Sequence, residues 1–239
     1  MKLCLYSPLF LKKKNINIEI KRSLNRKKTI TIQIRNGSIR ALSPYMTSDA
    51  QIEKLLYRNN DWINLKLKSY YKTKKKYEIF DKLKKVLFKG KKYDLNFFLL
   101  NNRIFEGLQQ NKIAILVKNN SFEEKKRKLE KWLFTQAKSY LKSRTYKIAE
   151  NHFLKFNNVS IRNYKSRWGS CDNKSNISLN WKLIMLPSKI TDYVIIHELC
   201  HTKYMDHSLS FWKLVSKLDY EYKHNRENLK DFGYFNSIF

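Results

Sequence analysis

The chain has 239 residues, of which 42% are hydrophobic, and only 5 Gly and 3 Pro. This composition describes a globular protein with a substantial core and excludes a disordered, collagen-like or low-complexity chain. The formal net charge is +30, because 50 Lys and Arg residues stand against 20 Asp and Glu. Such an excess indicates a polyanionic partner, with nucleic acid as the first candidate. Lys outnumbers Arg 39 to 11, however, and a genome-wide composition bias produces the same mixture.

The three cysteines, Cys4, Cys171 and Cys200, form no CxxC pair and predict neither a disulfide framework nor a cysteine-only metal site. The start of the chain lacks the pattern of a secretory signal. No apolar run approaches the roughly 18 residues that a membrane span requires. We therefore predict a cytoplasmic protein with no membrane partner.

Residues 1–120 are predicted to be rich in strands and to contain one helix. The dipeptide Asn36-Gly37 favours a hairpin turn, because both residues tolerate a positive φ. Thr47 or Ser48 caps the predicted helix, with Gln51 at the capping-box distance from Ser48, and the apolar spacing continues to about Tyr71. The predicted strands cover residues 16–20, 29–35, 38–42, 86–88, 93–100 and 113–117. The sequence leaves open whether these strands form a small barrel or extend another sheet.

A long amphipathic helix is predicted over residues 122–150, with Ser121 and Glu124 as its capping box. The positive charge lies before and within it: residues 151–239 hold 13 basic and 8 acidic residues, against 37 and 12 in residues 1–150. We therefore predict a basic N-terminal region, residues 1–120, and a second domain, residues 121–239, in which the chemistry resides. The fold class expected is α+β.

His197, Glu198 and His201 form an HExxH pattern within an apolar segment. Two histidines four residues apart lie one turn apart on a helix, so both imidazoles can bind one metal ion while the glutamate takes a proton from water. Buried polar groups of this kind are costly unless they are paired or bind a metal. The pattern predicts a Zn²⁺ site with His197 and His201 as ligands and Glu198 as the general base.

Two residues are candidates for the third ligand. His207 follows His201 by six residues, the spacing found in metzincins, although Tyr204 stands where that pattern has glycine. Glu221 is the alternative, because thermolysin-like sites draw a glutamate from a later helix. Asp206 is interpreted as a turn residue beside His207 or as a partner that orients a ligand, in preference to a ligand itself.

Several neighbouring segments have two interpretations each. Residues 177–186 are predicted to form a strand before the motif helix, in the position where a substrate chain pairs in zinc proteases. Arg167 either orients substrate or anchors Asp192. Tyr204 either packs or stabilises an oxyanion through its hydroxyl.

Four blocks of sequence resemble the YgjP-like metallopeptidase-domain family of bacterial metal-dependent hydrolases. The blocks are Ser166–Cys171, Ile177–Trp181, Asp192–His201 and His207–Ser208 with the following Phe211 and Trp212. The resemblance implies a zincin-like domain with an active-site helix packed on a small sheet, metal ligands at His197, His201 and His207, and a base at Glu198. It also implies kinship with the WLM and SprT-like proteases, which act on proteins crosslinked to DNA. The sequence departs from the family pattern by having Asp206 before His207.

The function predicted is a zinc-dependent metallopeptidase that acts on protein or peptide, with nucleic acid as a partner of the basic N-terminal region. One alternative is a metal-dependent nucleotide or phosphoanhydride hydrolase in which Lys165, Arg167 or Lys182 holds phosphates. The other is a nucleic-acid-binding module with a structural zinc ion. Only three ligands can be named, whereas a closed structural site usually has four.

Overall fold

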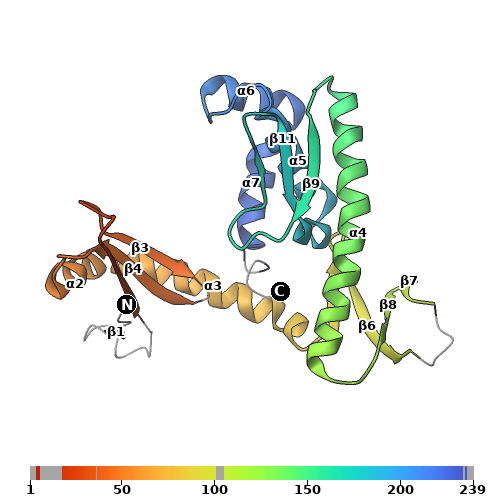
Figure 1. Cartoon of the computed structure of the whole chain (residues 1–239), viewed down its shortest axis with the longest axis horizontal. Helices are drawn as coiled ribbons and strands as arrows, with labels where there is room; N and C mark the ends of the chain where they lie inside the picture. The colour runs from red at the N-terminus through yellow and green to blue at the C-terminus, as the bar shows by residue number, and fades with distance from the viewer. Residues whose placement is uncertain (1–3, 6–17, 36, 101–104, 234, 236–239) are drawn as a thin grey trace. The chain divides into compact units, whose positions relative to one another are not determined.

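The computed structural model describes residues 4–5, 18–35, 37–100, 105–233 and 235 (Figure 1). The fold is α+β, as the sequence predicts. The chain divides into two compact units, residues 1–76 and residues 77–239. The predicted boundary at residue 120 concerns where the catalytic domain begins, and it stays a prediction.

The first unit contains a four-stranded sheet in the order β1-β2-β4-β3, called the N-terminal sheet below. The hairpin is confirmed by its strands and by Gly37, since β3 and β4 pair antiparallel from Arg35 and Ser38 onward and Gly37 has a φ of +76°; Asn36 lies outside the described residues. The single predicted helix is two helices that meet at Asn59, whose side chain donates to the carbonyl of Leu55 at 2.8 Å. The elements are β1 (Cys4–Leu5), β2 (Ile18–Ser23), β3 (Thr31–Arg35), β4 (Ser38–Pro44), α2 (Asp49–Arg58) and α3 (Asn60–Asp81).

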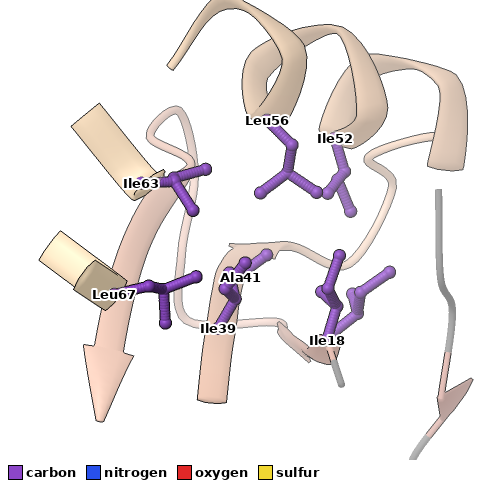
Figure 2. Close-up of a cluster of buried hydrophobic side chains, with 8 residues drawn as sticks. Ile18, Ile39, Ala41, Ile52, Leu56, Ile63 and Leu67 are labelled. Atoms are coloured by element: carbon purple, nitrogen blue, oxygen red, sulfur yellow. The ribbon is translucent and has the colours of Figure 1, made fainter. Parts of the chain in front are cut away.

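A cluster of aliphatic side chains joins the N-terminal sheet to α2 and α3 (Figure 2). Alternate residues of a strand face one side of the sheet, and helical residues four apart share one face, so the cluster contains residues at both spacings. The buried members of the cluster are Ile18, Ile20, Ile39, Ala41, Ile52, Leu56, Ile63 and Leu67.

The capping box predicted at the start of α2 is confirmed, because Ser48 and Gln51 exchange backbone-to-side-chain bonds of 3.3 and 3.1 Å.

The second unit begins with a four-stranded sheet in the order β5-β6-β8-β7, called the middle sheet. Three of its strands agree with predicted ones, and the short β7 was not predicted. The order gives the sheet two edges within the described residues, so it is open and not a barrel. Its strands are β5 (Lys85–Phe88), β6 (Lys91–Leu99), β7 (Gly107–Gln109) and β8 (Lys112–Val117).

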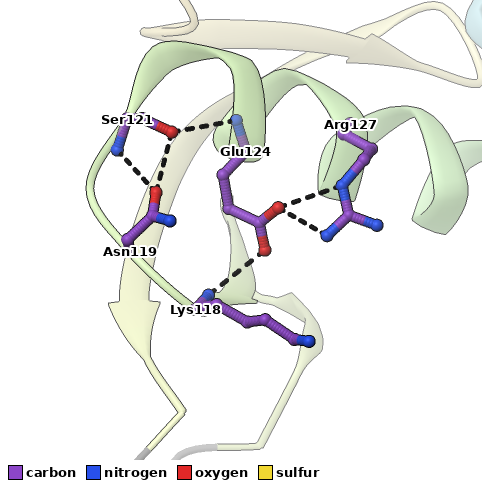
Figure 3. A network of polar contacts seen from close by, with 5 residues as sticks. All are labelled: Lys118, Asn119, Ser121, Glu124 and Arg127. Carbon is purple, nitrogen blue, oxygen red and sulfur yellow. Dashed lines mark hydrogen bonds and ion pairs between the residues drawn. The ribbon is translucent and has the colours of Figure 1, made fainter.

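The long predicted helix is α4 (Phe122–Asn151), and its start differs from the predicted capping box (Figure 3). Ser121 accepts from the Glu124 amide at 3.3 Å, as predicted. The Glu124 carboxylate instead accepts from Arg127 at 2.5 Å and from the Lys118 amide at 3.2 Å. The Arg127 bond in particular lowers the pKa of Glu124. The Ser121 amide donates to the Asn119 side chain at 3.1 Å, so Asn119 replaces the glutamate in that half of the box.

The remaining sheet, called the C-terminal sheet, has the order β10-β11-β9, with β11 antiparallel to β10 and parallel to β9. The strand predicted over 177–186 is wrong in its second half, where a 3₁₀ helix, η1, begins at Trp181. The Asn180 side chain accepts from the Lys182 amide at 3.2 Å, which caps η1 and ends the strand. The elements of this part are β9 (Asn158–Arg162), β10 (Gly169–Cys171), β11 (Asn176–Asn180), η1 (Trp181–Met185), α5 (Ser188–Cys200), α6 (Leu209–Leu218) and α7 (Tyr222–Asp231).

Helix α4 contacts the middle sheet through β8 and the C-terminal sheet through β9, and it also packs against η1 and α5 (Figure 1). Its buried positions recur every three to four residues, from Leu129 to Ile148, which gives one apolar face along its length. Helix α5 is buried along most of its length. No helix in the described part of the chain is long and apolar enough to cross a membrane.

Candidate metal centre

Helix α5, which carries His197 and Glu198 and ends beside His201, is tightly packed. Aliphatic side chains on several sides of it are almost completely buried, among them Ile190, Ile195 and Leu199. The helix therefore has little freedom to rotate or shift. The imidazoles of His197 and His201 lie one turn apart, as the spacing predicts, and the helix ends at Cys200, immediately before the second of them.

The three predicted histidines come together. His197 Nε2 lies 3.3 Å from His201 Nε2 and 3.1 Å from His207 Nε2. Tetrahedral zinc with Zn–N bonds of about 2.0–2.1 Å places its nitrogen ligands about 3.3 Å apart. The spacing of the nitrogens therefore fits one such ion. Within the described residues, these three form the group of His, Cys, Asp and Glu side chains that could hold a metal.

A tight turn brings His207 back to α5. Asp206 accepts from the Ser208 amide at 3.3 Å through its side chain, the turn role interpreted from the sequence. Ser208 then caps α6, since its hydroxyl accepts from the Phe211 amide at 3.4 Å. These two local hydrogen bonds thus hold His207 between the end of α5 and the start of α6.

Neighbouring groups fix the orientation of the rings. The carbonyl of Tyr204 accepts a hydrogen bond from His201 Nδ1 at 2.9 Å, which puts the proton on Nδ1 and leaves the lone pair of Nε2 toward the other histidines. Phe211 stacks on His201 with ring centroids 4.5 Å apart, and Trp212 stacks on His207 at 5.6 Å. Among the described residues, the buried Nδ1 of His197 has no hydrogen-bond partner.

Burial favours the neutral form of His197 and His201. Burial, with the neighbouring His201 and His207, lowers the pKa of His197 to about 3. Burial also lowers the pKa of His201. Neutral imidazole is the form that binds a metal ion, so these two rings are in the ligand form near neutral pH.

Glu198 follows His197 directly on α5 and has only 6% of its surface exposed. Burial raises the pKa of its carboxyl to about 8, while the positive charge of Arg167 opposes that rise. Helix α5 contacts β10 on this side, and burial together with the negative charge of Glu198 raises the pKa of the Cys171 thiol to about 11. Glu198, the acid–base candidate, therefore lies between helix α5 and strand β10.

The free edge beside this site belongs to β10. The predicted pairing strand, β11, is central in its sheet, so its backbone groups are already paired. The Asn180 amide donates to the Trp168 carbonyl at 2.8 Å, which makes these two residues a hydrogen-bonded pair. Because such pairs alternate along antiparallel strands, the N–H and C=O groups of Gly169 and Cys171 point away from β11. No other strand of the described chain covers that edge.

Two residues weighed for the site have other partners. Asp192 binds Arg144 of α4 through two contacts of 2.7 Å, so Arg144 has the anchoring role considered for Arg167. Glu221, the alternative third ligand, pairs with Lys189 at 2.8 Å and lies outside the histidine group. No sequence pattern indicates Arg144, because nothing distinguishes it from the other basic residues of its helix.

The remaining candidates lie as follows. Lys182 is buried, with 1% of its surface exposed, whereas Lys165 and Arg167 are exposed. The guanidinium of Arg167 lies 5.5 Å from the ring centroid of Tyr164. Tyr204 takes part in the site through its backbone carbonyl.

Comparisons with known proteins bear on the class of this site. The family model of the YgjP-like metallopeptidase domain matches residues 28–232. Among solved structures, the chain is similar to the metallopeptidase zymogen abylysin of Pyrococcus abyssi, with 23% identity and a TM-score of 0.34 over 37% of this chain and 90% of that one. Comparison with curated proteins gives no match. The family match covers most of the chain, which therefore belongs to the YgjP-like metallopeptidase-domain family, a family of metal-dependent proteases.

Proposed function

We propose that the chain is a zinc-dependent peptidase in which His197, His201 and His207 hold the ion and Glu198 is the general base. The observation that carries this proposal is the pair of Nε2–Nε2 distances, 3.3 and 3.1 Å, which match two edges of a tetrahedral nitrogen site. Three protein ligands leave one position for water or substrate, as catalytic zinc sites require.

A bound zinc ion lowers the pKa of water toward neutrality and polarises a carbonyl oxygen. The residues of the chain perform the remaining tasks. The Glu198 carboxylate accepts the proton from the attacking water and returns it to the nitrogen of the leaving amine. The surrounding burial limits competing water around that carboxylate. The bond from His201 to the Tyr204 carbonyl keeps the lone pair of Nε2 directed at the ion.

The substrate is proposed to be an extended peptide that pairs with β10. The outward N–H and C=O groups of Gly169 and Cys171 offer two residues of backbone pairing beside Glu198. Pairing through the backbone selects for an extended conformation and not for particular side chains. We therefore expect broad cleavage of unfolded protein and little cleavage of folded protein.

The two alternatives are less well supported. A phosphoanhydride hydrolase needs several cations at the site; Lys182 is buried near Trp181, at 5.9 Å from its ring centroid, which leaves Lys165 and Arg167 as exposed candidates. A structural zinc module needs a fourth ligand, and within the described residues three come together. An assay of nucleotides in parallel with a denatured protein separates the first alternative from the proposed peptidase.

The test combines metal content with activity. Glu198→Gln should retain about one zinc ion per chain and lose at least about a hundredfold in kcat on a denatured protein, because proton transfer is removed and the ligands remain. His207→Ala should lose zinc affinity. Full peptidase activity of Glu198→Gln, or unchanged zinc affinity of His207→Ala, would contradict the assignment.

We also propose that the first unit binds a polyanion, with nucleic acid as the partner. Residues 1–76 contain 19 basic and 4 acidic residues. Two of the arginines are paired: Arg22 contacts Asp49, and Arg40 lies 2.6 Å from Glu19. Other cations on α2 and α3 are exposed. Trp62 of α3 is also exposed, and its ring can stack on a base. These cations are Lys54, Arg58, Lys66, Lys68 and Lys72.

Salt dependence tests this second proposal. The full chain should bind a single-stranded oligonucleotide with an affinity that falls about tenfold or more between 50 and 200 mM salt. Replacement of the five exposed cations by Gln should reduce both the affinity and the slope, whereas replacement of five lysines in residues 151–239 should change them little. Weak binding that is insensitive to salt would leave the charge as a composition bias.

A further inference from the structure

Gly169, the first residue of β10, lies against the side chain of Glu198. A methyl group on the Gly169 Cα would lie 2.6 Å from Glu198 Oε1, 2.7 Å from Cγ and 2.8 Å from Cδ. Non-bonded carbon atoms prefer about 3.5–4.0 Å, so no residue larger than glycine fits here without movement. The φ of Gly169 is not among the positive values of the chain, so the requirement for glycine is one of space.

Glu198 has little room to move away from such a methyl group. Its side chain is 6% exposed, and it projects from a helix whose neighbouring side chains are buried. Rotation of the carboxylate alone does not relieve the contact, because Cγ and Cδ are as close as the oxygen. Relief requires a different rotamer nearer to the backbone, which moves the carboxylate from its present position against β10.

Strand β10 has equally little room, although it is an edge strand. Asn180, which is fully buried, donates its side-chain amide to the carbonyls of Tyr164 and Arg167, both at 3.0 Å. Its backbone amide donates to the Trp168 carbonyl at 2.8 Å. One buried residue of β11 thus fixes the chain that leads directly into Gly169, so the glycine cannot retreat without breaking the part-buried hydrogen bonds of Asn180.

We infer that Gly169 is a positioning residue: by lacking a side chain it sets where the Glu198 carboxylate lies relative to the three histidines. This inference rests on the proposed role of Glu198. It assigns to the first position of β10 a positioning role that acts through Glu198 and is separate from any pairing of the same strand with substrate.

A double-mutant cycle on the full chain tests the contact without reference to activity. In the metal-free protein, Gly169→Ala should lower Tm by about 3 °C or more. In the background of Glu198→Ala, which removes Cγ, Cδ and both carboxylate oxygens, the same change should cost less than about 1 °C. If the Gly169→Ala single mutant does not fold but the double mutant with Glu198→Ala does, that result also supports the contact.

Gly90→Ala is the matched control. Its methyl group would lie 2.7 Å from Pro187 Cα, and its φ is +78°, so the substitution is strained for reasons unrelated to Glu198. Pro187 and Glu198 are separated by most of α5, roughly 15 Å. Gly90→Ala should therefore lower Tm by the same amount with and without Glu198→Ala.

Kinetics supply the second readout. With zinc bound, Gly169→Ala should retain metal stoichiometry, keep KM within about threefold and lose at least about tenfold in kcat, because the proton acceptor is displaced. The inference is overturned if kcat is unchanged, or if the loss of Tm is equal in both backgrounds. If Glu198→Ala retains activity, the proposed function fails, while the coupling in Tm still decides the contact.

Discussion

Arg144 of α4 and Asp192 of α5 form a two-point ion pair, with Nε to Oδ1 and Nη2 to Oδ2 both at 2.7 Å. The two side chains are 33% and 21% exposed, so the pair is partly shielded from solvent. The hydrogen bonds to Asp192 raise the pKa of the Arg144 guanidinium. Asp192 precedes His197 by five residues on the same helix. The pair therefore ties the helix of the candidate metal site to the longest helix of the chain.

Removal of this pair should be measurable. Arg144→Ala should lower the free energy of unfolding by about 1–2 kcal/mol, because a partly shielded, two-point contact is lost. Arg144→Lys should recover less than half of that, since an ammonium group cannot make the paired contact. Urea unfolding of both variants, alone and with Asp192→Ala, gives the coupling. Strict additivity with Asp192→Ala would show that the pair contributes nothing.

The stacked ring of Trp212 should support the metal site. His207 is exposed, and the ring of Trp212 stacks on it at 24° between planes. Tyr222 stacks on Trp212 with centroids 5.7 Å apart. Trp212→Leu should weaken zinc binding about tenfold, because the His207 ring loses the support that fixes its orientation. Competition with a chromogenic chelator measures the affinity.

Arg226→Ala is the control for Trp212→Leu. The Arg226 guanidinium lies 4.8 Å from the Trp212 ring centroid and contributes positive charge near His197. Its removal should leave zinc affinity unchanged or slightly stronger. A zinc affinity that is the same in Trp212→Leu and the unaltered chain would show that the stacking does not orient the ligand.

Metal removal should lower the thermal stability of the second unit. An ion that binds the folded state alone stabilises it by about 2.7 kcal/mol at a free concentration of 100 times Kd. A chelator should therefore lower the corresponding Tm by roughly 5–10 °C. The same chelator should have little effect on His207→Ala. Equal Tm values with and without zinc would contradict binding at the three histidines.

Lys182 should make stability depend on pH in the alkaline range. Burial lowers its pKa from 10.5 to about 8 in the folded chain. Below pH 8 the side chain is charged in both states, and its burial opposes folding in full. Between pH 8 and 10.5 the unfolded chain holds more protons, so stability from this group rises with pH.

Lys182→Met tests that sign. The variant lacks this titration, so its stability relative to the unaltered chain should be highest at pH 7 and should decrease by about 3 kcal/mol toward pH 10.5. Urea midpoints at pH 7, 8.5 and 10 measure the difference. A difference that does not change with pH would show that Lys182 titrates normally.

Local patterns predicted much of the fold, and competing partners explain the differences. Ser48 and Ser121 are each followed three residues later by a residue of capping-box type, yet one box forms completely and the other does not. Arg127 and the Lys118 amide compete for the Glu124 carboxylate, and Asn119 satisfies the serine amide instead. A capping pattern therefore specifies the helix start more reliably than it specifies both bonds.

The site was predictable where it depends on spacing along one helix. His197 and His201 follow from that spacing, and the turn at Asp206 that returns His207 is also local. Arg144 is 48 residues from Asp192, and no periodicity relates two such positions. The contact between Gly169 and Glu198 likewise cannot be predicted without knowing how β10 packs against α5. Sequence patterns indicate which residues share an element, whereas contacts between elements depend on packing.

Helix α4 packs against strands of both sheets in the second unit. Neither sheet can lose its order without exposing part of the same apolar face, so residues 77–239 should unfold in one cooperative transition. The amides of β8 and β9 should then exchange hydrogen for deuterium with a common free energy of opening. The metal centre would share that free energy, since α5 also packs against α4.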